Sequence, residues 1–308
     1  MAFRFPVIAL TSFLALSTVA QAAPKVVVSI KPLHGLVSGV MDGVGKPELL
    51  IKAVQSPHHF SLKPSDARKV QNADAVIWVS EELETNLAKS LKSLNSKGLS
   101  LVMLAEEHDD HKEHDKHDDH DHHDNHKGHD DEHDHHHEID AHIWLDPRQA
   151  IEMVEKIEAG LSKIDPASAK TYAKNAHNLH VKLEKLDHDI HDQLHDVEDK
   201  AFVVFHDAFG HFNKRYHMNQ AGVVALSPES APGAKHIRHM RELVKTKNVK
   251  CVFYEPQFSD KMVKTVIEGT QIKTAKLDPL GADFDAGPQH YFQMMNNIGT
   301  TLKTCLGS

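Results

Sequence analysis

The sequence contains only two cysteines, Cys251 and Cys305, and no CxxC pair. Zinc sites built from cysteine usually need such closely spaced pairs, so the spacing argues against a cysteine metal site. Two cysteines in an exported protein usually pair with each other, and we expect a disulfide here. In the chain-entropy model, closing a loop of this length stabilises the fold by ~4 kcal/mol.

Long apolar runs are also scarce. The first 22 residues combine Arg4, an apolar stretch and the small-x-small pattern Ala20-Gln21-Ala22, which is typical of a secretory signal peptide. The stretch is short for a membrane span, and no second one follows. No cysteine near the cleavage site offers a lipid anchor. We therefore expect residues 1–22 to be removed and the mature chain to be soluble in the periplasm of a Gram-negative bacterium.

Basic charge and catalytic motifs are lacking as well. The formal net charge is −9 and no basic patch stands out, so the sequence predicts no nucleic-acid partner. GxSxG, P-loop and GxGxxG motifs are absent. HEIDA at 137–141 begins like the zinc-protease motif HExxH, but the second histidine comes one residue late, at His142. We expect a carrier and no enzyme; a zinc hydrolase is the alternative that measurable turnover would reveal.

Histidine, in contrast, is abundant: 13 of the 28 histidines lie between Glu106 and Glu138, among Asp, Glu and Lys. Imidazole is the commonest protein ligand for zinc, copper and nickel. Because residues 106–138 have hardly an apolar side chain, we expect a disordered, hydrated loop. Any three flexible imidazoles can bind together, which predicts accessory metal binding and no well-formed tight site. These histidines are His108, His111, His114, His117, His120, His122, His123, His126, His129, His133, His135, His136 and His137.

Short apolar runs alternate with longer amphipathic runs along the rest of the chain. This pattern predicts an α/β fold of two similar four-stranded βα lobes. The candidate ligands described below come from both lobes, so we expect the metal site in the cleft between the lobes. The N-terminal lobe covers 23–164 and the C-terminal lobe 200–308. Between them, 165–199 carries apolar residues at spacings of three and four, which predicts a single long rigid helix that joins the lobes. The expected strands are 26–30, 49–54, 75–79, 99–104, 201–205, 222–226, 251–254 and 272–277.

Ligands of open α/β sheets bind beyond the carboxyl ends of the strands. His206 and Asp278 directly follow expected strands of the second lobe, and His58 and His142 lie in loops of the first. Three imidazoles with a carboxylate or water make a tetrahedral site that suits Zn²⁺. We therefore predict that these histidines line the cleft, with Asp278 or water as the fourth ligand. His59 is a rival of His58 that spacing does not separate.

Four further histidines are interpreted as surface residues. His211 and His217 lie further along the helix that follows His206. His191 and His195, four apart on the long helix, can share a metal in principle, but solvated side chains explain them as well.

Several motifs carry a resemblance to a known family: SPHHFSLKPSDARKVQNADAVIWV, HIWLDP, FVVFHDAFGHF, EPQF and LDPLG, with the histidine-rich run just before HIWLDP. The chain resembles the periplasmic zinc-binding proteins of high-affinity zinc ABC uptake systems (ZnuA-type), within the metal-binding cluster of solute-binding proteins. The resemblance implies two αβ lobes joined by a long helix, with the metal between them. It also places the two cysteines where the zinc members have a pair.

The same resemblance implies the ligands His58, His142 and His206. Asp278 matches a ligand of manganese-binding relatives, and those relatives place Glu where this chain has His206. Histidine here favours zinc, because imidazole suits zinc and carboxylates suit manganese. Some zinc members have Glu just before the first ligand; this chain has Pro57 there, which leaves Asp278, water or a histidine of the loop for the fourth position.

The function implied is capture of Zn²⁺ in the periplasm and its delivery to an ABC transporter permease, with the histidine-rich loop as an accessory zinc collector. We expect the protein to act as a monomer. One alternative is a periplasmic zinc buffer or chaperone that is not coupled to a transporter. Another keeps the transport role with manganese, nickel or copper as the cargo.

Overall fold

The computed structural model describes residues 22–52, 54–94, 99–105, 140–225 and 232–307. All but the last residue of the expected signal peptide, and all 13 histidines of the histidine-rich run, lie outside these residues. Within the described ranges, no helix is long and apolar enough to cross a membrane.

The first lobe is built on a parallel sheet in the order β2-β1-β3-β4. Its strands are β1 (Val26–Val28), β2 (Glu48–Leu49), β3 (Ala75–Trp78) and β4 (Ser100–Met103). Parallel neighbours need crossover connections, and the helices α1 (Lys31–Val40), α2 (Pro64–Gln71) and α3 (Thr85–Leu94) lie in them. The two central strands, β1 and β3, are buried along their whole length and consist of apolar residues, as expected for a sheet covered on both faces.

The second lobe repeats this topology with the order β6-β5-β7-β8. Its strands are β5 (Phe202–Val204), β6 (Gln220–Val223), β7 (Cys251–Tyr254) and β8 (Lys273–Lys276), and its helices are α6 (Gly210–Tyr216), α7 (Ala234–Thr246) and α8 (Lys261–Ile267). The predicted α/β class with two similar four-stranded lobes is confirmed. Each expected strand overlaps an observed one, and most are shorter at one or both ends.

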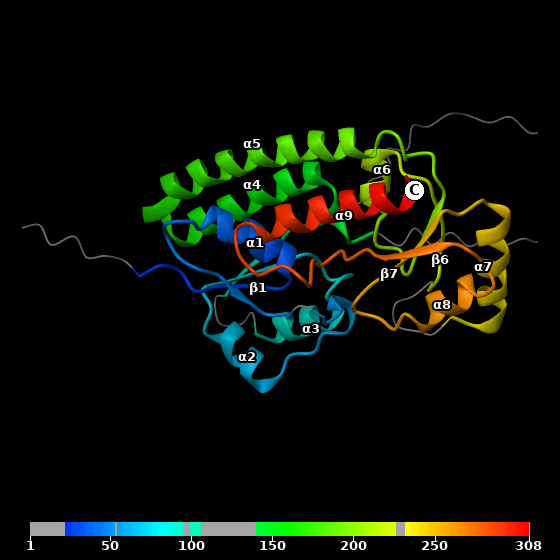
Figure 1. The fold of residues 1–308 in the computed structure, drawn as a ribbon. Coiled ribbons are helices and arrows are strands. Elements are labelled where there is room, and N and C mark those ends of the chain that lie inside the picture. The colour runs from blue at the N-terminus through cyan, green and yellow to red at the C-terminus, as the bar shows by residue number, and fades with distance from the viewer. Residues whose placement is uncertain (1–21, 53, 95–98, 106–139, 226–231, 308) are drawn as a thin grey trace, which may run out of the picture.

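A layer of long helices lies over both lobes (Figure 1). It contains α4 (Pro147–Ile164), α5 (Ala169–Leu194) and α9 (His290–Leu306). The 26 residues of α5 give a length of ~39 Å. The joining helix begins later than the sequence indicated, because Pro166–Ser168 form a 3-10 turn that separates α5 from α4. The helix α4, which sequence reasoning missed, packs along α5, so the joining helix does not cross the lobes alone.

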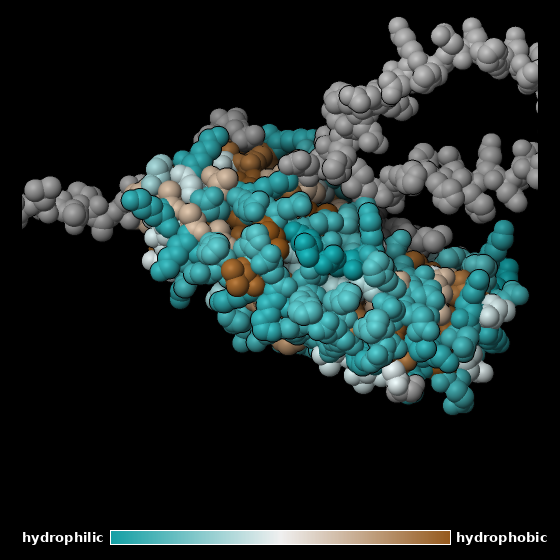
Figure 2. Space-filling view, turned by 90° about the horizontal axis from the view of Figure 1, so that it is seen from above, coloured by the Kyte–Doolittle hydropathy of each residue, from teal (hydrophilic) through white to brown (hydrophobic). Residues whose placement is uncertain are grey.

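One hydrophobic core continues through the two lobes. It runs from the first sheet through α1 and the helical layer to the inner side of the second sheet, and includes Leu33, Tyr172, Ile190, Phe202 and Tyr291. A smaller cluster fills the other side of the second sheet. Close-packed interiors resist rearrangement, so this shared core fixes how the carboxyl ends of the two sheets face each other. The outer face that carries α5 is mostly hydrophilic (Figure 2).

A buried carboxylate adds a polar contact between the lobes. Asp187 on α5 is 3% exposed and accepts a hydrogen bond from Arg148 Nε of α4 at 3.0 Å. It also accepts hydrogen bonds from Arg215 and from the Tyr216 hydroxyl, both on α6. Asp187 thus ties the helical layer to the second lobe through three charge-assisted or buried hydrogen bonds.

The predicted disulfide is confirmed: Cys251 of β7 is bonded to Cys305 of α9. The bond ties the central strand of the second sheet to the last helix of the layer.

A candidate metal centre

Three histidines that are far apart in the sequence meet where the lobes face each other. His58 lies in the short 3-10 helix η1 (Pro57–His59), His142 directly precedes η3 (Ile143–Leu145), and His206 follows β5 by two residues. One ring nitrogen of each histidine lies within 4.8 Å of a ring nitrogen of both others. No second group of three or more His, Cys, Asp or Glu side chains with this spacing occurs in the described part of the chain.

The structure separates His58 from its neighbour in the sequence. The His58 ring lies 5.4 Å from that of His142 and 5.8 Å from that of His206, measured between ring centroids. His59 is exposed and lies outside the three-histidine group. Pro57, the first residue of η1, is buried, and its ring restricts the backbone at the start of this turn.

Two carboxylates hold two of the histidines from behind. Asp140 Oδ1 accepts hydrogen bonds from the backbone N–H of His142 at 3.0 Å and from its Nδ1–H at 2.8 Å. Glu255, which follows β7 in the neighbouring loop, treats His206 in the same way: Oε1 accepts from the backbone N–H at 3.3 Å and from Nδ1–H at 2.6 Å. Carboxylates in this position fix the tautomer and the ring orientation of metal-binding histidines.

These hydrogen bonds determine which ring nitrogen of His142 and of His206 carries the proton, and therefore which nitrogen has a free lone pair. A neutral imidazole that donates through Nδ1 has a lone pair on Nε2. The Nε2 atoms of His142 and His206 lie 3.4 Å apart, so two acceptors face each other at close range in a buried site. They cannot satisfy one another without a shared cation or proton. Two ligands at 2.0–2.1 Å from one tetrahedral zinc ion are ~3.4 Å apart, which matches this separation.

The third histidine, His58, has a ring nitrogen that is free to bind a metal ion. His58 Nε2 is buried and has no hydrogen-bond partner within the described residues. Burial, together with the smaller effects of the nearby His142 and His206, lowers the pKa of His58 to about 3, although Asp140 acts in the opposite direction. Burial also lowers the pKa of His142, against the effect of its hydrogen bond to Asp140. Metal binding requires neutral imidazole, and these environments favour the neutral form.

Asp278, the predicted fourth ligand, lies close by but outside the three-histidine group. Its Oδ1 accepts hydrogen bonds from Gln257 Nε2 at 2.9 Å and from the backbone N–H of Leu280 at 3.0 Å, and its Oδ2 accepts one from Ala282 N–H at 2.6 Å. The carboxylate therefore shapes the loop after β8. Within the described residues, the buried Oε1 of Gln257 has no hydrogen-bond partner, so Gln257 offers an oxygen beside the cavity.

The cavity beside the three rings is small, about 10 Å³, and apart from the polar residues Ser56, Glu255 and Gln257 its other walls are apolar. Trp144, Phe258 and Leu280 provide these walls. Trp144 also crosses between the lobes, because its indole N–H donates to the Pro279 carbonyl at 2.8 Å, and Tyr291 donates to the Trp144 carbonyl at 2.7 Å. A space of this size suits one ion or one water and excludes larger ligands.

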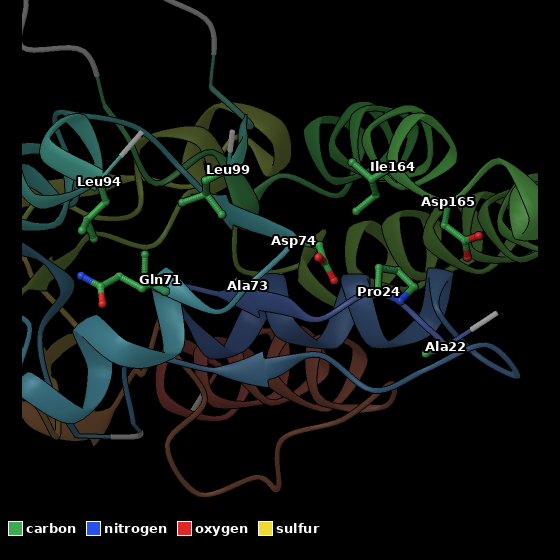
Figure 3. A pocket seen from close by; sticks show the side chains of 10 residues that line it. Ala22, Pro24, Gln71, Ala73, Asp74, Leu94, Leu99, Ile164 and Asp165 are labelled. Carbon is green, nitrogen blue, oxygen red and sulfur yellow. The ribbon is translucent and has the colours of Figure 1, made fainter. Parts of the chain in front are cut away.

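A larger depression of about 510 Å³ lies near the starts of β3 and β4 (Figure 3). These are the amino ends of the first lobe's strands, whereas the metal site lies beyond the carboxyl ends. Its lining includes Asp74 and Asp165 but no histidine or cysteine. The chemistry of its side chains does not favour zinc, so the metal site is assigned to the smaller cavity.

Sequence reasoning missed the side chains that hold the histidines. Asp140 and Glu255 were not singled out, although Asp140 is two residues before His142 and Glu255 follows a strand next to β5, where cleft residues are expected. The interpretation of His211 as a surface residue is wrong. It is partly buried, and its ring nitrogens lie 2.7 Å from the Asp140 carbonyl and 2.8 Å from Gln149 Nε2.

Known proteins of one family are similar to this chain along nearly its whole length. Residues 26–305 match the family described as zinc-uptake complex component A, periplasmic (ZnuA). The high-affinity zinc uptake system protein ZnuA of Brucella abortus (strain 2308) is 44% identical over 313 residues, covering 94% of each chain. The protein of the same name from Haemophilus ducreyi is 38% identical and covers 96% of each chain.

Solved structures agree in fold. The Zn(II)-bound ZnuA-like domain of Streptococcus pneumoniae AdcA superposes with a TM-score of 0.70 at 25% identity, covering 93% of this chain and all of that domain. A crystal structure of ZnuA gives a TM-score of 0.72 at 21% identity, covering 91% of this chain and 99% of the other.

Proposed function

Because this chain belongs to the ZnuA family of periplasmic zinc-uptake components, we propose that it captures Zn²⁺ with His58, His142 and His206 and delivers it to an ABC transporter permease. The ion is the cargo of the protein. The observation that carries the proposal is the pair of Nε2 atoms, 3.4 Å apart, whose lone pairs face each other in a buried cavity. Only a cation or a proton relieves that arrangement, and zinc fits its spacing.

Zinc is favoured over manganese by the chemistry of the donors. The group offers three imidazole nitrogens and no carboxylate oxygen, and imidazole suits zinc while carboxylates suit manganese. The relatives from Brucella abortus and Haemophilus ducreyi carry the name of a high-affinity zinc uptake protein, which supports uptake over a buffer without a transporter. A fourth ligand is supplied by water, or by Asp278 after its hydrogen bonds rearrange.

The histidine-rich run is proposed to act as a collector beside this site. A random-coil chain of about 30 residues would span ~30 Å, which is the reach that this role requires. Weak binding by its imidazoles would raise the local zinc concentration near the main site. Export through residues 1–22 places the protein in the periplasm, and the mature chain acts as a monomer in this proposal.

The test is a calorimetric zinc titration of the chain without residues 1–22, next to a variant that also lacks 108–137. The proposal expects the deletion to keep one tight site and to lose only weaker ones. In the deletion background, His58→Ala should abolish tight binding, whereas His59→Ala should keep it, because His59 is exposed and outside the group. Loss of tight binding on deletion, or equal behaviour of the two alanine variants, refutes the assignment.

A further inference from the structure

Asp140 holds His142, but Asp140 is itself held by the other lobe. It stands in the loop before η3, and the first residues of α6 pack against it. The Nε2 of His211 lies 2.7 Å from the backbone carbonyl of Asp140 and 3.9 Å from its Oδ2. Asp140 therefore lies between His142 on one side and α6 on the other.

The hydrogen bonds of His211 define its tautomer. The Asp140 carbonyl only accepts, so His211 Nε2 carries the proton and donates it there. Its Nδ1 then accepts a hydrogen bond from the amide of Gln149 on α4 at 2.8 Å. The ring thus bridges α6 of the second lobe to α4 and to the Asp140 loop, with both nitrogens used.

Gly210 is the second part of this contact. A Cβ at this position would lie 2.5 Å from Asp140 Oδ2, well inside the van der Waals distance. The absence of a side chain at the first residue of α6 is what lets the carboxylate take its place under His142. The backbone conformation of Gly210 does not require glycine; the close approach does.

We infer that Gly210 and His211 are positioning residues that set the direction of His142 through Asp140. The second lobe then orients two of the three imidazoles, its own His206 through Glu255 and His142 through α6. A partner that shifts α6 against α4 would break the His211 hydrogen bond and free His142 to turn, which lowers zinc affinity. The inference rests on the proposed zinc site and adds a route for controlling it.

The matched test compares two substitutions of His211, because the amide of glutamine replaces Nε2 of the imidazole and the amide of asparagine replaces Nδ1. In His211→Gln the side-chain amide can still reach the Asp140 carbonyl, whereas in His211→Asn the shorter amide can reach only Gln149. Zinc affinity, measured by competition with a chelator on the chain lacking 1–22 and 108–137, should stay within about twofold for the glutamine variant. It should fall about tenfold for the asparagine variant, as is typical when an outer-shell partner of a metal ligand is lost.

Gly210→Ala provides an independent arm. It should lower zinc affinity in the otherwise unchanged chain and have no effect in an Asp140→Ala background, where the obstructed carboxylate is gone. His217→Asn, at the exposed end of α6, is the control that should leave affinity unchanged. Urea unfolding of each metal-free variant checks that the fold persists, and the visible spectrum of bound Co²⁺ reports the ligand geometry.

Equal affinities of His211→Gln and His211→Asn would overturn the inference, as would an additive effect of Gly210→Ala in the Asp140→Ala background. These results differ from failure of the proposed function. If His142→Ala keeps tight zinc binding, the zinc site itself is wrong; if His142→Ala abolishes it while the α6 variants bind normally, only the inference about α6 fails.

Discussion

Replacing Glu255 by glutamine removes a negative charge from behind His206 and keeps the shape of the side chain. Glu255 is 2% exposed, its Oε1 lies 2.6 Å from His206 Nδ1, and its Oε2 is buried without a partner within the described residues. The charge makes the imidazole a stronger electron donor and holds the proton on Nδ1, so that Nε2 is free for a metal. Its loss should therefore weaken zinc binding without removing a ligand.

The size of the effect follows from what glutamine can still do. Changes to such outer-shell carboxylates cost 10–100-fold in metal affinity. Glutamine keeps an oxygen that accepts from Nδ1–H, so we expect the lower end, about tenfold or ~1.4 kcal/mol. Glu255→Leu keeps no acceptor and leaves the tautomer open, so about 100-fold is expected. The matched control is Glu268→Gln, the same chemical change at a side chain of the same lobe that is 71% exposed.

The assay is zinc competition against a chelator of known affinity, with urea unfolding of the metal-free proteins beside it. Because Oε2 of Glu255 has no hydrogen-bond partner among the described residues, the unfolding free energy should change by less than about 1 kcal/mol while zinc affinity falls. If Glu255→Gln and Glu268→Gln bind zinc within twofold of each other, the carboxylate does not support His206 and the reasoning fails.

Three further predictions concern stability, all measured by urea unfolding of the metal-free protein. Burial raises the pKa of Glu84 to about 7 from 4.5. The protonated carboxyl therefore stabilises the fold fully below pH 4.5, and about 3 kcal/mol is lost as the pH rises through 7, a loss that Glu84→Gln should not show. Asp187→Asn should cost about 2 kcal/mol, since its two charged partners, Arg148 and Arg215, are partly exposed and solvent weakens their contribution. Asp189→Asn on the same helix should cost under about 0.5 kcal/mol, because its ion pair is exposed. Replacing Cys251 and Cys305 together by serine should cost about 4 kcal/mol.

Each of these stability predictions has a contrary result. A pH slope that is the same in Glu84→Gln and in the original chain would mean that this carboxyl does not titrate in the expected window. Equal losses at 187 and 189 would mean that the buried network does not join α5 to the second lobe. Unchanged stability of the double serine variant would show that the shared core alone fixes α9.

The alternation of apolar and amphipathic runs was sufficient to find the strands. Val26–Val28 and Ala75–Trp78 are continuous apolar runs because both faces of their sheet are covered, and such runs are readable without knowing their partners. Boundaries shifted where pairing decides them: β2 is only Glu48–Leu49, because its pairing with β1 ends there. The helix α4 went unnoticed, and Asp165-Pro166, which resembles a helix start, opens a one-turn 3-10 segment between two long helices.

The sequence by itself was sufficient to predict the α/β lobes, the disulfide, and the histidines that follow strands or precede short turns. These depend on residue type and local spacing, which a linear chain displays directly. Only the tertiary structure decided that His58, and not His59, joins the three-histidine group. It also decided that both oxygens of Asp278 accept hydrogen bonds from the backbone of the loop that follows it. The tertiary structure likewise places Asp140 between His142 and α6, and Glu255 next to His206. Such pairings depend on distances across two lobes that meet through a shared core, and no local pattern encodes those distances.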